Sequence, residues 1–233
     1  MHLTGRKVVV IGAARQGLAT AKYLARHGAH PVVTDMRSAV QLAEAQAALA
    51  GLPVAWALGG HPLSLLDGAA LVCLSGGVPS DIELVRVAKE RNITISNDSQ
   101  LFLELAPCRV VGITGSAGKT TTTTLVGRML AGLEGHGVRK VWVGGNIGRP
   151  LLADVDEMQA DDIAVMELSS FQLEWMTRAP QVAAILNLAP NHLDRHADMD
   201  EYVAAKARIL DFQSSEDIAV LNREDSRSWP LAE

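Results

Sequence analysis

The sequence has few cysteines, few aromatic residues and no long apolar segment. Its two cysteines, Cys73 and Cys108, lie beside apolar residues without CxxC spacing, which argues against a disulfide framework or a thiolate metal site. No apolar run approaches the roughly 18 residues that span a bilayer, and no signal-peptide core follows the N-terminus. We therefore expect a cytoplasmic protein with both cysteines in its core and no membrane partner.

An excess of positive charge is also missing. The 233 residues carry a formal net charge of -5, with 21 Lys and Arg against 26 Asp and Glu. A protein that binds nucleic acid through a broad basic surface would show the opposite balance, so no nucleic-acid partner is expected. Any anionic ligand must be bound by a few well-placed groups.

The apolar residues indicate an α/β fold. Short runs rich in Val and Ile alternate with Ala- and Leu-rich stretches of helical period, the pattern of βα units around a parallel sheet. Expected strands are "KVVVIG", "HPVVTD", "AALVCLS", "ITISN", "RVVGIT", "KVWVGGN", "DIAVMELS", "VAAILNLAP" and "DIAVLN". Because each half has its own glycine loop after a strand, we expect two domains, residues 1–98 and 99–233. The first is a Rossmann-like parallel-sheet domain, and the second is an incomplete P-loop ATPase-type α/β domain.

Helix signals accompany these strands. Residues 17–28 have helical period and end at Gly28, which is typical of a helix C-terminus. In "SDIELVRVAKERN", Ser80 is the expected N-cap, with Glu83 as its capping-box partner.

The first glycine loop, "VVVIGAARQG", partly matches the dinucleotide-binding fingerprint. Gly12 and Gly17 lie between a strand and a helix, and Asp35 ends the next strand. The middle glycine is replaced by Ala14, whose methyl group obstructs a pyrophosphate, so a nucleotide other than a dinucleotide fits better. A tight turn without any ligand is the open alternative. Arg37, two residues after Asp35, is suited to a phosphate or a pyrimidine carbonyl.

The second glycine loop, "GSAGKTTTTT", fits GxxGK[ST], shorter than the usual phosphate-loop pattern. Its backbone N–H groups and the Lys119 ammonium suit phosphate oxygens, and the Thr120 hydroxyl suits Mg²⁺. Thr121 lies in the first helical turn, where it can also reach phosphate. The residues that follow, Thr122 to Thr124, are expected in the wall of the helix. A turn with an exposed lysine is the alternative.

Polar residues follow the other strands of this half. Glu167 ends the strand "DIAVME", and His192 follows "VAAILNLAPN". Ligands of parallel α/β sheets gather at the carboxyl ends of the strands, so we expect both residues to face Lys119. Thr120, Glu167 and His192 together would suit Mg²⁺ or Mn²⁺.

Lys206 lies on an apolar stripe. Tyr202, Lys206 and Ile209 share one helix face at i, i+4, i+7 spacing, which points the lysine inward. A surface lysine that snorkels to water is the alternative.

Five segments resemble successive motifs of the Mur ligase family. They are "GITGSAGKTT", "GGNIG", "MELSSFQLE", "NHLDRH" and "YVAAKARI", in the right order and over essentially the whole chain. The family has a UDP-sugar domain, a central ATPase domain and a C-terminal domain, of which this chain holds the first and the front part of the second. Two positions depart from the family pattern: Ala117 replaces an asparagine, which predicts one hydrogen bond fewer near the nucleotide, and Asn191 stands where Asp is common.

The resemblance implies a set of site residues. For the ATP phosphates they are Gly115, Ser116, Ala117, Gly118, Lys119, Thr120 and Thr121. For two Mg²⁺ sites, with Mn²⁺ as an alternative metal, they are Thr120, Glu167, His192 and a carbamylated Lys206. The catalytic residues are Lys119, Glu167, His192 and Lys206. For the UDP-linked substrate they are Ala14, Arg15, Gln16, Asp35, Arg37, Ser75, Asn146, Ser169 and His192.

The implied reaction is an ATP-dependent amide ligation in cell-wall synthesis. "MELSSFQLE" most resembles family members that add D-glutamate to UDP-N-acetylmuramoyl-L-alanine through an acyl phosphate. The implied partners are these two substrates and ATP, bound by a monomer. Two alternatives stay open: a family member that adds another amino acid or acts on folate, and a nucleotide-binding fragment without activity.

Overall fold

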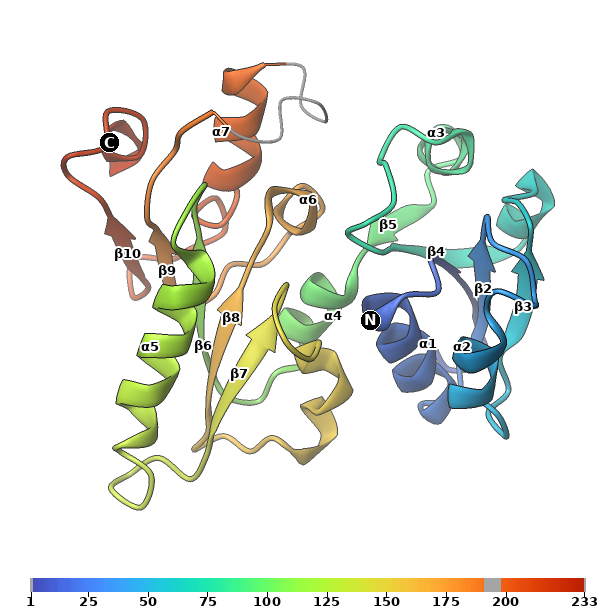
Figure 1. Ribbon diagram of the computed structural model, residues 1–233, viewed down its shortest axis with the longest axis horizontal. Helices are drawn as coiled ribbons and strands as arrows, with labels where there is room; N and C mark the ends of the chain where they lie inside the picture. The colour runs from blue at the N-terminus through green and yellow to red at the C-terminus, as the bar shows by residue number, and fades with distance from the viewer. Residues whose placement is uncertain (1, 191–197, 233) are drawn as a thin grey trace. The chain divides into compact units, whose positions relative to one another are not determined.

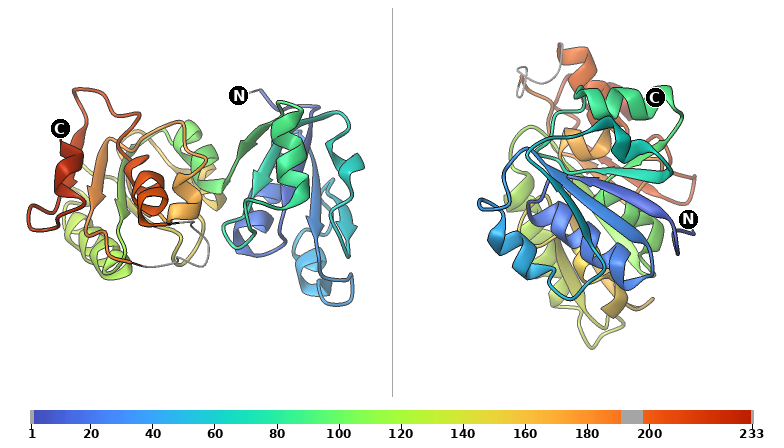
Figure 2. Two further views of the ribbon diagram at one scale, coloured as in Figure 1. Left: turned by 90° about the horizontal axis from the view of Figure 1, so that it is seen from above. Right: turned by 90° about the vertical axis from the view of Figure 1, so that its right-hand side faces the viewer.

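The chain folds as two α/β units. The computed structural model describes residues 2–190 and 198–232, and the units comprise Met1–Asp98 and Ser99–Glu233. Each unit contains one five-stranded sheet in which all paired strands are parallel, with helices packed against it (Figure 1, Figure 2). The expected fold class is therefore confirmed. Over the described ranges, no helix has the length and apolar character needed to cross a bilayer.

The first unit has the strand order β3-β2-β1-β4-β5. Its strands are β1 (Lys7–Ile11), β2 (His30–Asp35), β3 (Ala55–Leu58), β4 (Ala69–Leu74) and β5 (Thr94–Ser96). Its helices are α1 (Arg15–Arg26), α2 (Ala43–Ala48), the 3₁₀ helix η1 (Leu63–Leu66) and α3 (Glu83–Glu90). The strand order reverses between β1 and β4, which is where open α/β sheets bind ligands.

The central strand β1 is buried on both faces. Val8, Val9, Val10 and Ile11 are all 0% exposed, because β1 pairs with β2 and β4 and helices cover the sheet. This explains its continuous apolar run, which is typical of parallel sheets. The strand β3 pairs only with β2 among the described strands and is half-buried. Its four residues show no clear strand pattern, so β3 was not among the predicted strands.

The turn from β1 into α1 requires two glycines. Gly12 has a φ of 96°, in the left-handed region that favours glycine. Gly17 lies in the first turns of α1, where an added Cβ would clash with the carbonyl oxygen of Gly12. The helix begins at Arg15, two residues before the expected start, so Ala14 is its N-cap.

The expected capping box of α3 is wrong. The helix begins at Glu83 and its N-cap is Ile82, without a side-chain capping bond. Ser80 therefore lies outside the helix, and Glu83 occupies the first helical position instead of the third. The acidic side chain still suits the positive end of the helix dipole.

The second unit has the strand order β10-β9-β6-β8-β7. Its strands are β6 (Arg109–Thr114), β7 (Val141–Gly145), β8 (Ile163–Glu167), β9 (Val182–Ile185) and β10 (Ile218–Leu221). Its α-helices are α4 (Asp98–Leu105, beginning at the last residue of the first unit), α5 (Lys119–Ala131), α6 (Ser170–Leu173) and α7 (Met199–Ala207). Its 3₁₀ helices are η2 (Leu151–Ala153), η3 (Val155–Glu157) and η4 (Trp229–Ala232).

Opposite faces of β6 meet different helices. Ile113 belongs to an apolar cluster that includes Val126 and Leu130 of α5. A Cβ at the adjacent Gly112 would meet Ile209, just beyond α7. Because successive strand residues point to opposite faces, α5 and the α7 segment cover the two sides of β6. Both helices thus pass the carboxyl end of this strand, where the candidate site lies.

The two cysteines are buried and free. Cys73 is 2% exposed in β4 and Cys108 is 6% exposed just before β6. Their expected role as small core residues is confirmed.

Gly17→Ala should destabilise the first unit because the new methyl group clashes with backbone. We expect the free energy of unfolding to fall by about 1–3 kcal/mol, the usual cost of overpacking. Urea denaturation followed by circular dichroism measures this. Gly77→Ala is the matched control, since a Cβ there has no neighbour within 4 Å. Equal stabilities of the two variants would contradict the close approach of α1 to the Gly12 carbonyl.

Candidate functional sites

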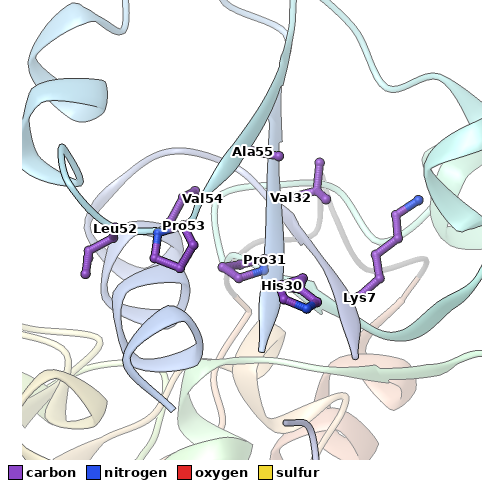
Figure 3. A pocket seen from close by; sticks show the side chains of 8 residues that line it. All are labelled: Lys7, His30, Pro31, Val32, Leu52, Pro53, Val54 and Ala55. Atoms are coloured by element: carbon purple, nitrogen blue, oxygen red, sulfur yellow. The ribbon is translucent and has the colours of Figure 1, made fainter. Parts of the chain in front are cut away.

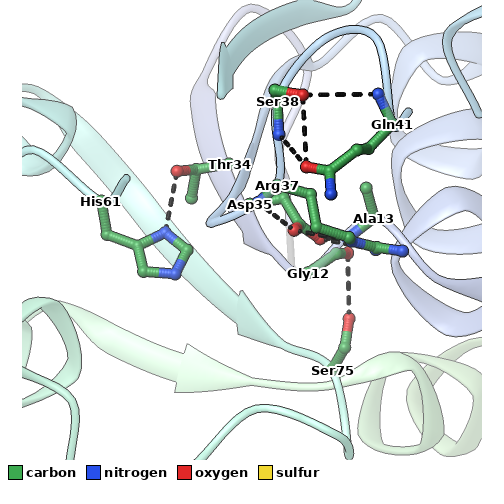
Figure 4. A network of polar contacts seen from close by, with 9 residues as sticks. All are labelled: Gly12, Ala13, Thr34, Asp35, Arg37, Ser38, Gln41, His61 and Ser75. Atoms are coloured by element: carbon green, nitrogen blue, oxygen red, sulfur yellow. Dashed lines mark hydrogen bonds and ion pairs between the residues drawn. The ribbon is translucent and has the colours of Figure 1, made fainter. Parts of the chain in front are cut away.

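In the first unit, Asp35 organises the carboxyl ends of β1 and β2. Its carboxylate accepts hydrogen bonds from Ala13 N at 2.8 Å and Arg37 N at 2.9 Å. The Arg37 guanidinium adds two bonds, from Nε at 3.0 Å and from Nη2 at 2.9 Å (Figure 4). These bonds from Arg37 hold the pKa of the Asp35 carboxyl well below its usual range, with burial opposing them. Asp35 is therefore ionised and fully engaged at neutral pH.

This pairing gives Arg37 a fixed direction. The arginine side chain is 47% exposed, and its Nη1 group takes no part in the fork with Asp35. A guanidinium held by one carboxylate keeps further N–H donors for an acceptor such as a phosphate or a carbonyl. Arg37 can thus offer N–H donors to a ligand, while Asp35 holds the Arg37 side chain and the loop after β1 in place.

Other predicted residues join the same edge of this sheet. Ser75, at the end of β4, donates from Oγ to the Gly12 carbonyl at 3.3 Å. Gln16 accepts at Oε1 from Gly76 N at 3.0 Å, which ties α1 to the loop after β4. Ala14 and Arg15 are exposed at the start of α1. The first unit therefore brings together all six substrate-site residues that were predicted within it.

His61 is a residue that the sequence analysis missed. Thr34 Oγ1 donates to Gly60 O at 2.9 Å, so it must accept the 2.9 Å bond from His61 Nδ1 (Figure 4). Burial lowers the pKa of His61, with the Asp35 charge opposing this, so the ring is neutral at physiological pH. Its Nε2 is then a hydrogen-bond acceptor. The segment "GGH" (residues 59–61) could have indicated a polar residue at the end of a strand. That strand is β3, which was not predicted, so His61 was not considered.

In the second unit, the glycine loop after β6 leads directly into α5. Gly118 is the N-cap of α5 with a φ of 80°, and Gly115 has a φ of 152°. The ammonium of Lys119 turns back over this loop and donates to Gly115 O at 2.9 Å and Ser116 O at 3.2 Å. A phosphate at the start of α5 would offer this lysine a charged acceptor in place of two neutral ones.

Glu167 is buried at the end of β8 and receives two neutral donors. Thr120 Oγ1 donates to its Oε2 at 2.8 Å, and Asn146 Nδ2 donates to its Oε1 at 2.8 Å. The residue is 1% exposed and forms no salt bridge within the described residues. A buried carboxylate without a cation is costly, so this group suits a bound hard cation.

Lys206 is buried beside this carboxylate. It is 1% exposed, and its Nζ donates to Thr114 Oγ1 at 3.2 Å while lying 4.9 Å from the centre of the Tyr202 ring. Burial lowers its pKa to about 7, with the Lys119 charge adding to this and the Glu167 charge opposing it. The stripe of Tyr202, Lys206 and Ile209 therefore faces inward as predicted, and the snorkelling alternative is wrong.

The remaining predicted residues have different positions. Ser169 is the N-cap of α6, in a capping box with Gln172. Ser116 Oγ lies 2.9 Å from Ala189 O and 3.1 Å from Tyr202 Oη. His192 and Asn191 lie outside the described residues. Within the ranges that the structure describes, no three His, Cys, Asp or Glu side chains lie close enough together to hold a metal.

A pocket opens at the opposite edge of the first sheet. It has a volume of about 510 Å³ and lies at the amino ends of β1, β2 and β3, between Lys7, His30 and the Leu52–Ala55 segment (Figure 3). Asp35 ends β2 at the other edge, so this pocket is separate from the candidate substrate site.

Two family models match the chain. Residues 6–97 match the Mur ligase MurD-like N-terminal domain, and residues 113–232 match the Mur ligase middle domain. The chain belongs to the Mur ligase family. The predicted resemblance is therefore confirmed, over both units.

Curated relatives within the family are called UDP-N-acetylmuramoylalanine–D-glutamate ligase. The relative from Geotalea uraniireducens (strain Rf4) is 44% identical over 226 residues, which cover 97% of this chain and 49% of the relative. The relative from Trichlorobacter lovleyi is 40% identical over 234 residues, which cover 100% of this chain and 52% of the relative. The chain thus spans about half the length of the curated relatives it matches.

Solved structures of other Mur ligases share the fold. The UDP-N-acetylmuramate:L-alanyl-gamma-D-glutamyl-meso-diaminopimelate ligase from Neisseria meningitides matches with a TM-score of 0.60 at 18% identity, covering 97% of this chain and 74% of that one. A murein peptide ligase from Psychrobacter arcticus matches with a TM-score of 0.56 at 16% identity, covering 97% and 51%. At these identities the likeness concerns the fold alone.

Lys206→Met should stabilise the metal-free protein at low pH. Unfolded lysine has a pKa near 10.4, and folded Lys206 has one of about 7. Between these values the unfolded chain binds more protons, so wild-type stability rises with pH across this window. We expect the variant to raise the unfolding midpoint by roughly 5 °C at about pH 6, and the gain to shrink towards pH 10.

Thermal denaturation in carbonate-free buffer with a chelator measures this gain. Lys89→Met, at an exposed position of α3, is the control that should show no such pH dependence. A gain of the same size at low and high pH would show that the buried amine is not the cause.

Proposed function

We propose that this chain supplies the UDP-sugar-binding and ATP-binding parts of an ATP-dependent ligase that joins D-glutamate to UDP-N-acetylmuramoyl-L-alanine in peptidoglycan synthesis. The observation that carries this is the convergence of Lys119, Thr120, Glu167 and Lys206 at one sheet edge, in a chain 40–44% identical to relatives with that ligase name. In the reaction, the ATP γ-phosphoryl group passes to the substrate carboxylate. The D-glutamate amine then attacks the acyl phosphate, and phosphate leaves.

The phosphate loop and α5 provide the electrostatic part of this chemistry. The first N–H groups of a helix have no carbonyl one turn earlier, and the helix dipole adds positive potential there. Lys119 brings a full positive charge to the same point, from a side chain that donates to two loop carbonyls. Together these groups would offset the charge on the phosphoryl group that is transferred.

The residues around Glu167 fit a magnesium ion. Thr120 supplies a hydroxyl oxygen and Glu167 a buried carboxylate. The two groups are directly hydrogen-bonded to each other. Bound Mg²⁺, or Mn²⁺, would act as a Lewis acid that neutralises phosphate oxygens. We propose His192 as a further ligand and two such ions in all. Asn146, which holds the second carboxylate oxygen, would orient Glu167 and contact the UDP-linked substrate.

Lys206 fits the proposed carbamate. Only a neutral amine attacks carbon dioxide, and the burial that lowers the pKa of Lys206 makes the neutral form abundant. In that step the nitrogen bonds to the carbon of CO₂ and loses one proton to solvent. The product carries a negative charge where an ammonium stood, so it can help to bind the metal.

The first unit would hold the uridine diphosphate part of the substrate. Arg37, fixed by Asp35, presents donors at the edge where Ala14, Gln16 and Ser75 also lie. The replacement of the middle fingerprint glycine by Ala14 fits a ligand that is not a dinucleotide. We propose Ser169 as a substrate contact in the second unit, a monomeric enzyme, and a reducing cytoplasm, which suits two free cysteines.

Binding measurements on this chain test the proposal directly. Calorimetry should detect UDP-N-acetylmuramoyl-L-alanine and, in the presence of Mg²⁺, ADP. In a protein that contains this chain and turns over, Lys119→Ala should reduce acyl-phosphate formation by at least about a hundredfold, because it removes a charge that stabilises the transition state. Amide formation with D-glutamate, but not with L-alanine, L-glutamate or meso-diaminopimelate, identifies the branch of the family. Near-normal turnover of Lys119→Ala would overturn the assignment.

The threonine run gives a second test. Thr120 contacts Glu167, whereas Thr123 is 0% exposed and its hydroxyl has no partner among the described residues. We expect Thr120→Val to weaken Mg²⁺-dependent ADP binding by about tenfold or more, since it removes a metal-facing oxygen. Thr123→Val, an isosteric change at a buried hydroxyl, should leave binding unchanged. If titration calorimetry gives both variants the same affinity, the run is structural.

A further inference from the structure

Asn187, two residues beyond the end of β9, forms hydrogen bonds with the phosphate loop through both its side chain and its backbone. Its Oδ1 accepts from Ala117 N at 2.9 Å, and its Nδ2 donates to Ala117 O at 3.0 Å. Its carbonyl oxygen accepts from Ser116 N at 2.9 Å. Three hydrogen bonds therefore connect Asn187 to two consecutive residues of the loop.

These bonds occupy two backbone donors of the loop. The N–H groups of Ser116 and Ala117 both donate to Asn187, so they already have acceptors in the protein without a ligand. The N–H groups of Lys119, Thr120 and Thr121 lie in the first turn of α5, where no carbonyl of the helix itself can accept from them, so they can meet an anion. The donors for a phosphate are thus concentrated at the start of α5.

The loop has no side chain of its own that could replace this contact at its tip. Residue 117 is an exposed alanine, which offers only a methyl group. The amide that fixes the backbone of Ala117 comes instead from the neighbouring strand. Since β9 pairs with β6 and Leu186 N donates to Thr114 O at 3.0 Å, Asn187 is itself held beside the loop by the sheet.

We propose that Asn187 is a positioning residue that fixes the phosphate loop and directs a bound nucleotide phosphate to the first turn of α5. It keeps the Ser116 and Ala117 N–H groups out of the phosphate site, which differs from the phosphate-binding role that the family resemblance implies for these two residues. This inference rests on the proposed nucleotide binding of the second unit. Asn187 acts through the loop and contacts neither the phosphate nor the metal.

Removal of the Asn187 side chain provides the first test. Asn187→Ala should weaken binding of ADP with Mg²⁺ by about tenfold, because two hydrogen bonds that preorganise the loop are lost. Asn222→Ala is the matched control: Asn222 donates from Nδ2 to Leu186 O at 3.1 Å, next to Asn187, and no hydrogen bond joins it to the loop among the described residues. Calorimetry on the 233-residue chain should give this control the wild-type affinity. Uridine diphosphate binding by the first unit should be unchanged in both variants, since both substitutions lie in the second unit.

Backbone NMR of the unaltered chain provides the second test. On addition of ADP with Mg²⁺, the amide signals of Lys119, Thr120 and Thr121 should shift strongly, and those of Ser116 and Ala117 weakly. The Ala117 amide should be protected from hydrogen exchange in the wild type and in Asn222→Ala, and lose protection in Asn187→Ala.

The possible outcomes separate the two proposals. If the wild type binds no ADP, the nucleotide-binding function fails and this inference fails with it. If the wild type binds ADP and Asn187→Ala binds it equally well, only the role of Asn187 is overturned. Strong ADP-induced shifts at Ser116 and Ala117 would also overturn that role, even if Asn187→Ala did not fold.

Discussion

The burial of two ionisable side chains is the constraint on which the second unit depends. Glu167 and Lys206 are each 1% exposed, and a polar group without water must find other hydrogen-bond partners. Glu167 finds them in Thr120 and Asn146, which connects the end of β8 with α5 and with the segment after β7. Lys206 finds its partner in Thr114, which connects α7 with the end of β6. The hydrogen bonds of these two side chains thus hold five segments in place relative to one another.

The sequence predicted the sheets well because parallel strands carry a strong local signal. Continuous apolar runs such as Val8–Ile11 reflect burial on both faces, which only a covered strand permits. The meeting of Thr120 and Glu167 in the second unit was predictable for a related reason. Polar side chains such as Glu167 directly after such runs must lie at one edge of the sheet, so chain order alone indicates that they meet. The inward direction of Lys206 followed equally from its place on a helical stripe.

Features that depend on contacts between distant segments were not predictable in this way. The bond between His61 and Thr34 joins the segment after β3 to β2, and β3 itself is too short and too exposed to show a strand pattern. The hydrogen bond between Asn187 and Ala117 joins residues 70 positions apart, and the two residue types alone do not predict that they pair. At Ser80 the error was different: the residues of a capping box were present, but the helix begins at Glu83, two residues later than they predict.

The two units solve the same structural problem with different chemistry. In each, a side chain at the end of a neighbouring strand accepts a backbone N–H from the loop after the unit's central strand: Asp35 from Ala13, and Asn187 from Ala117. The carboxylate in the first unit is balanced by Arg37, and the pair presents a guanidinium at the sheet edge. A carboxylate at position 187 would place a negative charge beside the first turn of α5. A neutral amide fixes the loop without reducing the positive potential that phosphate binding requires.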